Sequence, residues 1–221
     1  MQIPTLQNKK LFELAFTHRS YLNEAKEKLE SNERLEFLGD SILSFIVSDY
    51  LFTKYPHYNE GILTNIRSLV VNTKSLAQSA ETLNFGEYLK LSKGEEESKG
   101  RQNQSLLADC FESYVGALFL DRGVDAVKHF ILDILVPKID DLVSKQAFKD
   151  PKSLLQEYVQ AQKQTSPLYK VVNEKGPAHA RIFTVGVFIG DKQTGLGVGK
   201  SKQQAEESAA EAALLEIKAK E

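Results

Sequence analysis

Residues 32–41 of the chain read NERLEFLGDS, a segment that sets two carboxylates among apolar side chains. Glu36 and Asp40 are four residues apart, so a helix places both on one face. A second acidic pair, Asp109 and Glu112, is three residues apart within the sequence LADCFES. Carboxylates in apolar helices are costly unless their charge is compensated, and a hard divalent cation with oxygen ligands would supply that compensation.

Composition points to an ordinary globular protein of 221 residues with a single cysteine and a net charge of −2. One cysteine excludes an internal disulfide, and it fits a reducing compartment. No apolar run approaches the ~18 residues of a membrane span, and residues 1–10 lack the apolar core of a signal peptide. We therefore expect a cytoplasmic protein with no membrane association.

Residues 1–145 are expected to form an all-α domain, because apolar residues recur at three- and four-residue spacing. Ser31 or Asn32 would cap the helix that carries the first acidic pair. A glycine-bounded, charged loop is expected over residues 94–100. Further helices are predicted over residues 60–71, 74–83, 104–120, 125–136 and 137–143.

A polar linker is predicted over residues 146–150, and a second, small α+β domain over residues 151–221. This tail shows a helix that starts at Asp150-Pro151, three β-like runs, and an alanine-rich helix capped by Ser201 with Gln204. The order is α-β-β-β-α. The body carries a slight excess of acidic residues and the tail a slight excess of basic ones.

These segments together resemble the ribonuclease III family. The resemblance is carried by residues 32–41, by THRSY at residues 17–21 and by LADCFES at residues 107–113. The tail resembles a double-stranded-RNA-binding domain through LLQE at residues 154–157, GPAH at residues 176–179 and GKSK before the last helix. The match extends over almost the whole chain.

The resemblance implies a Mg²⁺-dependent endonuclease that cuts double-stranded RNA, with Mn²⁺ expected to substitute. It implies products with 5′-phosphate and 3′-hydroxyl ends and short 3′ overhangs. It also implies a homodimer and a role in RNA maturation that includes ribosomal RNA precursors.

Four carboxylates correspond to the metal ligands of the family: Glu36, Asp40, Asp109 and Glu112. Asp40 and Glu112 are expected to be the catalytic pair. A phosphodiester repels hydroxide and has a poor leaving group, so a cation on these oxygens would activate water and neutralise developing charge. The alternative is that both pairs make surface salt bridges, which is the commoner fate of a single i,i+4 pair.

Other residues of the first domain match the family less specifically. Glu33 and Glu60 match acidic positions near the site, although Glu33 would serve equally well as a solvated acid at a helix start. Phe37 matches an aromatic residue of the dimer interface, and an ordinary core phenylalanine is the alternative. His18 is expected to be structural, because no His/Cys set has the spacing of a zinc site. Cys110 is expected to pack in the core.

In the tail, the resemblance implies that RNA is recognised by its A-form shape and its 2′-hydroxyls. One set of residues would face the minor groove and the other would meet phosphates at a helix N-terminus. The expected contacts are Ser153, Gln156, Glu157, Gln160, Pro177, His179, Lys200 and Lys202. Gln203 and Gln204 stand where the family often has further basic residues, which predicts weaker binding by the tail.

Three other functions fit the sequence less well. The segment GLGVGKS at residues 195–201 imitates a phosphate-binding P-loop, but Thr194 stands where that motif requires glycine. A double-stranded-RNA-binding protein without catalysis would be expected to lack an acidic ligand, and all four are present. A di-iron carboxylate protein would use Glu-x-x-His pairs, and residues 109–112 contain no histidine.

Overall fold

The chain divides into two compact units, Met1–Phe148 and Lys149–Glu221. The computed structural model describes residues 3–26, 28–148, 150–177 and 180–218. His179, one of the predicted RNA contacts, lies outside the described residues.

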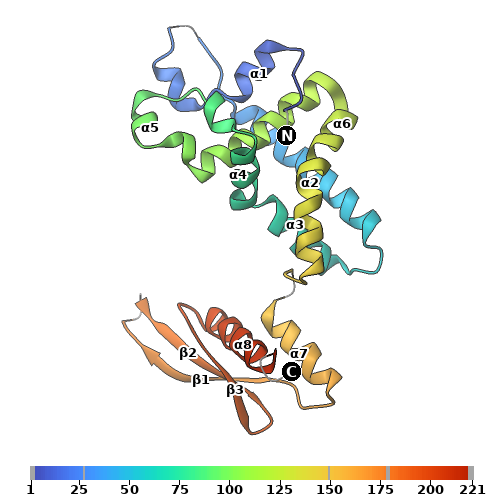
Figure 1. Cartoon of the computed structure of the whole chain (residues 1–221). Coiled ribbons are helices and arrows are strands. Elements are labelled where there is room, and N and C mark those ends of the chain that lie inside the picture. The colour runs from blue at the N-terminus through green and yellow to red at the C-terminus, as the bar shows by residue number, and fades with distance from the viewer. Residues whose placement is uncertain (1–2, 27, 149, 178–179, 219–221) are drawn as a thin grey trace. The chain divides into compact units, whose positions relative to one another are not determined.

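The first unit is all helical within its described residues (Figure 1). Its α-helices are α1 (Lys9–Ala15), α2 (Glu33–Lys54), α3 (Glu60–Val71), α4 (Thr73–Thr82), α5 (Lys93–Glu97) and α6 (Gln104–Ser144). Short 3₁₀ turns lie at Arg19–Asn23, Phe85–Tyr88 and Gly100–Gln102. The predicted all-α class of this unit is confirmed.

Two local predictions for this unit were wrong. The expected loop at residues 94–100 begins as helix α5, because the Ser92 hydroxyl accepts from the Glu95 N–H and acidic residues of the first turn favour the helix dipole. The predicted helix break at Pro137 is absent, and Pro137 lies inside α6. A kink does occur at Gly123, whose φ of 77° is readily adopted by glycine, and it falls in the predicted gap between the helices over residues 104–120 and 125–136.

Helices α2 and α6 form the centre of this unit, with the other helices packed around them. Leu43, Ile46 and Leu51 of α2 are buried. From α6, Phe111 and Tyr114 are fully buried, and Cys110 is buried with them as predicted. One core therefore encloses the middle of both helices that carry the acidic pairs.

The second unit has the predicted α-β-β-β-α order (Figure 1). Its elements are α7 (Pro151–Ala161), β1 (Leu168–Lys175), β2 (Ile182–Ile189), β3 (Lys192–Gly199) and α8 (Lys202–Lys218). The strands form an antiparallel sheet in the order β1-β2-β3. Leu155 and Val159 of α7, Val185 and Val187 of β2, and the alanines of α8 form its core.

The glycines of the P-loop-like segment have a packing role. A Cβ on Gly195 would lie 2.3 Å from the Ala209 carbonyl oxygen, and one on Gly197 would lie 2.1 Å from the Ala209 nitrogen. Only glycine lets β3 approach the alanine-rich face of α8 this closely. The segment is therefore a strand that supports a helix, which agrees with its rejection as a nucleotide-binding loop.

Among the described residues, no helix is long and apolar enough to cross a membrane.

Candidate metal centre and RNA-binding unit

Three of the four predicted ligands converge. Ligand oxygens of Glu36 on α2 and of Asp109 and Glu112 on α6 all lie within 4.8 Å of one another. All three side chains are half-buried. Asp40, one helical turn beyond Glu36, is exposed and lies outside that group of three. Its charge nevertheless acts on Glu112, so it lines the same acidic site.

Two mid-helix glycines bring the acidic pairs together. A Cβ on Gly39 would lie 1.8 Å from the Glu112 carbonyl oxygen, and one on Gly116 would lie 2.3 Å from the Leu35 carbonyl oxygen. The backbones of α2 and α6 therefore meet in direct contact at these glycines. Because Glu36 and Glu112 stand within one turn of this crossing, their carboxylates face the same space.

The N-terminal end of α2 is tied to α6 by a buried serine. The Ser113 hydroxyl is 2.7 Å from the Asp109 carbonyl oxygen and 3.3 Å from the Asn32 carbonyl oxygen. The Asn32 N–H in turn donates to the Thr17 carbonyl at 2.9 Å. These contacts hold the 17–21 segment, the start of α2 and the start of α6 around the cluster.

Burial and mutual repulsion make these carboxylates hard to ionise without a cation. Burial, and then the charges of Asp40, Asp109 and Glu36, raise the pKa of Glu112 to about 8. Burial and the neighbouring Asp109, Glu33 and Asp40 charges raise the pKa of Glu36, against the opposing effect of Arg19. The site is thus an acidic cluster with too little positive charge of its own.

Asp109 is partly compensated by the upstream segment. Burial raises its pKa, while the charges of His18 and Arg19 act in the opposite direction. The His18 ring has a structural role as well, since its Nδ1 accepts from the Ser20 N–H at 3.3 Å and caps the 3₁₀ turn at Arg19–Asn23. The THRSY segment therefore lies beside the acidic cluster and contributes charge to it.

The donor set fits a hard divalent cation. Its atoms are carboxylate oxygens, the ligands preferred by Mg²⁺ and Ca²⁺, and histidine and cysteine are absent from the group of three. A cation would relieve the repulsion that raises the pKa of Glu112 and Glu36. The cluster can therefore hold a metal ion.

The less specific predictions for this unit are placed as follows. Glu33 is exposed, accepts from the Ser31 hydroxyl at 2.7 Å and pairs with Arg19 at 3.6 Å. Glu60 begins α3, accepts from the Thr64 hydroxyl at 3.1 Å, and is not one of the three converging ligands. Phe37 is 79% exposed, which rules out a core position for it.

In the second unit, the expected RNA contacts of α7 form one polar stripe. Ser153, Glu157 and Gln160 are exposed and recur at three- and four-residue spacing, opposite the buried face of the helix. Gln156 lies along the same side, and its amide donates to the Ser166 hydroxyl at 3.0 Å. Pro177, in the β1–β2 connection, is exposed.

The start of α8 carries the two predicted lysines. Lys200 and Lys202 are both exposed, and the Lys202 ammonium lies 5.7 Å from the centre of the Phe183 ring. Gln204 is used locally, because its N–H donates to the Ser201 hydroxyl and its side chain accepts from the Lys200 N–H. Gln203 pairs with Glu207. The two glutamines therefore serve the helix start.

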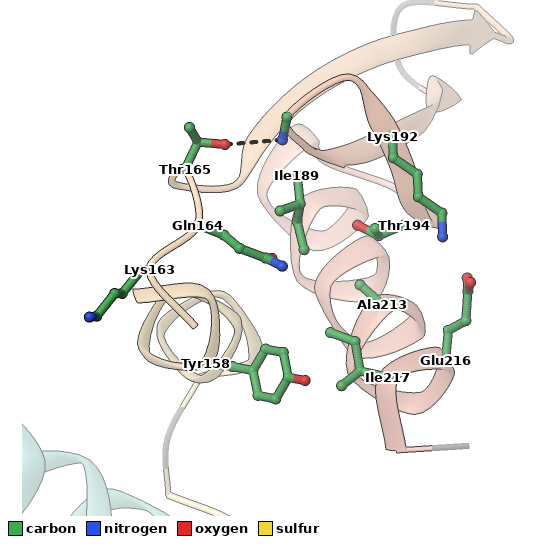
Figure 2. A pocket seen from close by; sticks show the side chains of 11 residues that line it. Tyr158, Lys163, Gln164, Thr165, Ile189, Lys192, Thr194, Ala213, Glu216 and Ile217 are labelled. Carbon is green, nitrogen blue, oxygen red and sulfur yellow. Dashed lines mark hydrogen bonds between the residues drawn. The ribbon is translucent and has the colours of Figure 1, made fainter. Parts of the chain in front are cut away.

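A cavity of about 500 Å³ lies near the C-terminal ends of α7 and α8 (Figure 2). Tyr158 and Ile217 line it from the two helices, and Thr165 closes one side by accepting from the Gly190 N–H at 3.1 Å. It contains none of the converging carboxylates. We therefore assign it no part in catalysis.

Comparison with known proteins agrees with both units. Residues 8–139 match the family model described as Ribonuclease-III-like, and residues 151–217 match the double-stranded RNA binding motif. The chain is 47% identical to Ribonuclease 3 of Geobacillus kaustophilus, over 97% of this chain and 87% of the relative. It is 44% identical to Ribonuclease 3 of Streptococcus pyogenes, over 94% of this chain and 90% of the relative.

Solved structures give the same result. The nuclease domain of ribonuclease III from Campylobacter jejuni matches with a TM-score of 0.55 and 37% identity, over 59% of this chain and 88% of that one. That structure is described as showing flexibility in a region involved in dimer formation. Dicer from Pichia stipitis matches with a TM-score of 0.52 and 30% identity, over 97% of both chains.

Fold and site together define a class: a helical nuclease with a carboxylate cluster, joined to a module that binds duplex RNA. The chain belongs to the ribonuclease III family. It is an endoribonuclease that acts on double-stranded RNA.

Four residues that matter here were missed by sequence reasoning. Gly39 and Gly116 could have indicated a close helix crossing, because glycine inside a helical pattern is unfavourable unless another backbone approaches closely.

Phe45 and Phe52 are 65% and 75% exposed on the same helix as Phe37. At 3.6 residues per turn, the three rings project within about 80° of one another. Their spacing alone did not reveal exposure, since core residues repeat in the same way.

Proposed function

We propose that the acidic cluster binds Mg²⁺, which Mn²⁺ can replace, and that this site hydrolyses phosphodiester bonds of duplex RNA. The observation that carries the proposal is the convergence of Glu36, Asp109 and Glu112 within 4.8 Å, from two distant segments. When bound there, the cation would activate a water molecule and neutralise charge on the phosphodiester. The proposed products have 5′-phosphate and 3′-hydroxyl ends with short 3′ overhangs.

The side chains have separate tasks in this proposal. Glu36, Asp109 and Glu112 hold the cation, and Asp40 adds a fourth, exposed carboxylate to the site. We assign catalysis to Asp40 and Glu112, since Asp40 is accessible and the pKa of Glu112 is raised to about 8, first by burial and then by the charges of its neighbours. Arg19 offsets part of the negative charge at the mouth of the site. Glu33 and Glu60 take no direct part.

The second unit would hold the duplex. The stripe Ser153, Gln156, Glu157 and Gln160 would contact one minor groove, and the β1–β2 connection with Pro177 and His179 would contact the next. Lys200 and Lys202 would meet the phosphates between them. Two lysines are a small cationic patch, so we expect modest affinity that falls steeply with added salt.

We also propose a homodimer formed through α2. Phe37, Phe45 and Phe52 make an aromatic stripe of a kind that solvent-exposed helices seldom carry. An apolar cavity of about 450 Å³ lies at the end of this stripe, lined in part by Phe52, Tyr55 and Tyr58. A symmetric interface that covers the stripe would remove these rings from water.

The substrates we propose are RNA precursors with long duplex stems, including those of ribosomal RNA, processed in the cytoplasm. The test is incubation of the purified chain with long duplex RNA, with and without Mg²⁺, followed by gel electrophoresis. Single-stranded RNA and duplex DNA serve as controls. Cutting that is confined to duplex RNA and requires the metal is the expected result.

Glu112→Gln tests the residue assignment. The substitution keeps the shape of the side chain and removes the negative charge, so duplex binding should persist while Mg²⁺-dependent cleavage is lost. Ser105→Ala, at an exposed position two turns earlier on α6, is the matched control and should cleave normally. Undiminished cleavage by Glu112→Gln would refute the proposed site.

A further inference from the structure

We infer that Phe148 is a positioning residue, which anchors the end of the first unit and thereby limits the free chain that carries the RNA-binding unit. The inference rests on the proposed function, because it concerns how the second unit helps the acidic cluster to capture duplex RNA. It is carried by the contacts on either side of the predicted linker at residues 146–150.

The end of α6 is closed by a hydrogen-bonded turn. Gln146 has a φ of 50°, in the left-handed region. Its N–H donates to the Val143 carbonyl at 3.1 Å, and the Ala147 N–H donates to the Leu142 carbonyl at 2.9 Å. These two bonds form a Schellman motif, which satisfies the last carbonyls of a helix and reverses the chain. The first two residues of the predicted linker, Gln146 and Ala147, are therefore ordered against the helix.

Phe148 follows this turn and belongs to the core of the first unit. It is only 3% exposed, and its ring centre lies 5.4 Å from that of Tyr58. The Asn65 side-chain amide donates to its carbonyl oxygen. A polar, weakly patterned sequence thus contains one apolar residue that is fixed by packing and by a hydrogen bond.

The second unit begins almost at once. The Asp150 carboxylate accepts from the Ser153 N–H at 3.0 Å and caps α7. One residue separates Phe148 from Asp150 in the sequence. The turn holds residues 146 and 147 by its own hydrogen bonds, so without the Phe148 ring only the Asn65 hydrogen bond would still tie residue 148 to the first unit, and the connection would lengthen.

A longer connection weakens cooperation between two tethered binding sites. The effective concentration of one site at the other falls roughly as the −3/2 power of the connection length once the connection exceeds the span required. On this scaling, a fivefold longer connection would lower it by about tenfold, and a connection of twice the length by about threefold. The affinity of the whole chain for duplex RNA should fall by about three- to tenfold, while the turnover of bound RNA should stay the same.

The experiment compares four variants of the full chain. One carries Gly-Ser-Gly-Ser inserted after Phe148, which lengthens the connection and leaves the core intact. The second is Phe148→Ala, and the third is Phe148→Leu, which keeps an apolar anchor. The fourth, Leu76→Ala, truncates a buried core residue of α4 that is not part of the connection and controls for general destabilisation. Duplex dissociation constants without divalent metal, KM and kcat with Mg²⁺, and melting temperatures are measured.

The inference predicts that the insertion and Phe148→Ala raise both the dissociation constant and KM by about three- to tenfold at unchanged kcat. Phe148→Leu should recover most of the affinity, and Leu76→Ala should lower the melting temperature without changing affinity. If Phe148→Ala unfolds, the insertion decides the result. Unchanged affinity in the insertion variant overturns the inference, even where the unmodified chain cleaves duplex RNA normally. Failure of the unmodified chain to bind or cut duplex RNA would overturn the proposed function as well.

Discussion

At the scale of single residues, Glu112 is central to the acidic site. It is half-buried, it lies with Glu36 and Asp109 in a group spanning less than 4.8 Å, and its pKa is raised to about 8. A carboxylate that resists ionisation in the metal-free protein becomes an effective ligand once a cation compensates its neighbours. Metal binding and proton release at this residue are therefore coupled.

This coupling predicts an effect of pH on stability. The folded-state pKa of Glu112 exceeds its unfolded value, so the folded protein holds a proton between about pH 4.5 and 8 that the unfolded chain has released. The contribution of Glu112 to stability is full below about pH 4.5 and is lost as pH rises to about 8. After allowance for solvent screening, we expect it to be about 1–3 kcal/mol.

Thermal unfolding in a chelating buffer at pH 5 and pH 8 measures this difference. Glu112→Gln should flatten the pH dependence and raise the melting temperature at pH 8. Without the chelator, added Mg²⁺ should stabilise the unmodified protein more than this variant. An identical pH dependence in the two proteins would show that Glu112 does not hold the proton.

At the scale of secondary-structure elements, the crossing of α2 and α6 creates the site. Neither helix contains all the ligands, and the two pairs meet because Gly39 and Gly116 let the backbones touch. Long side chains at these positions would separate the helices by the width of a side chain. The arrangement of the carboxylates is therefore set by Gly39 and Gly116, which have no reactive side chain.

Gly39→Ala tests this crossing. The new Cβ would lie 1.8 Å from the Glu112 carbonyl oxygen, which is part of the backbone and cannot turn aside. We expect a loss of about 1–3 kcal/mol in stability and a large loss of cleavage. Gly94→Ala is the matched control, because its Cβ would meet nothing within 4 Å. Melting temperatures and cleavage rates of both variants provide the measurement, and full activity of Gly39→Ala would contradict the role given to the crossing.

At the scale of the whole molecule, the exposed stripe of α2 bears on assembly. Phe37, Phe45 and Phe52 would cost little to replace in a monomer, since they are 79%, 65% and 75% exposed. In a dimer formed through this stripe, a charge placed among the rings would be buried without a partner. A charged substitution in the stripe should therefore disrupt assembly without disrupting the folding of the single chain.

Phe45→Glu should convert the protein to a monomer, which sedimentation measures directly, with its helical circular dichroism unchanged. Leu120→Glu places the same charge at another exposed apolar residue, one that is 54% exposed, and should leave the assembly intact. A Phe45→Glu protein that sediments as the unmodified protein does would place the interface elsewhere.

Local pattern was sufficient for much of this molecule. The three- and four-residue spacing of Leu35, Leu38 and Ile42 predicts helix α2, because helix periodicity is a local property. The β-branched run of residues 182–189 and the Ser201 cap predict the second unit in the same way. The two acidic pairs and their shared chemistry were also recognisable, since each pair lies within one helical turn.

Long-range packing decided the rest. That Glu36 lies beside Asp109 and Glu112 follows from the glycine crossing, and exposure of Phe37 follows from which side of α2 the core covers. Burial of Phe148 in an otherwise polar segment depends on Tyr58 and Asn65, more than 80 residues earlier. Contacts between residues so far apart depend on how the helices pack, and no spacing along the chain encodes that directly.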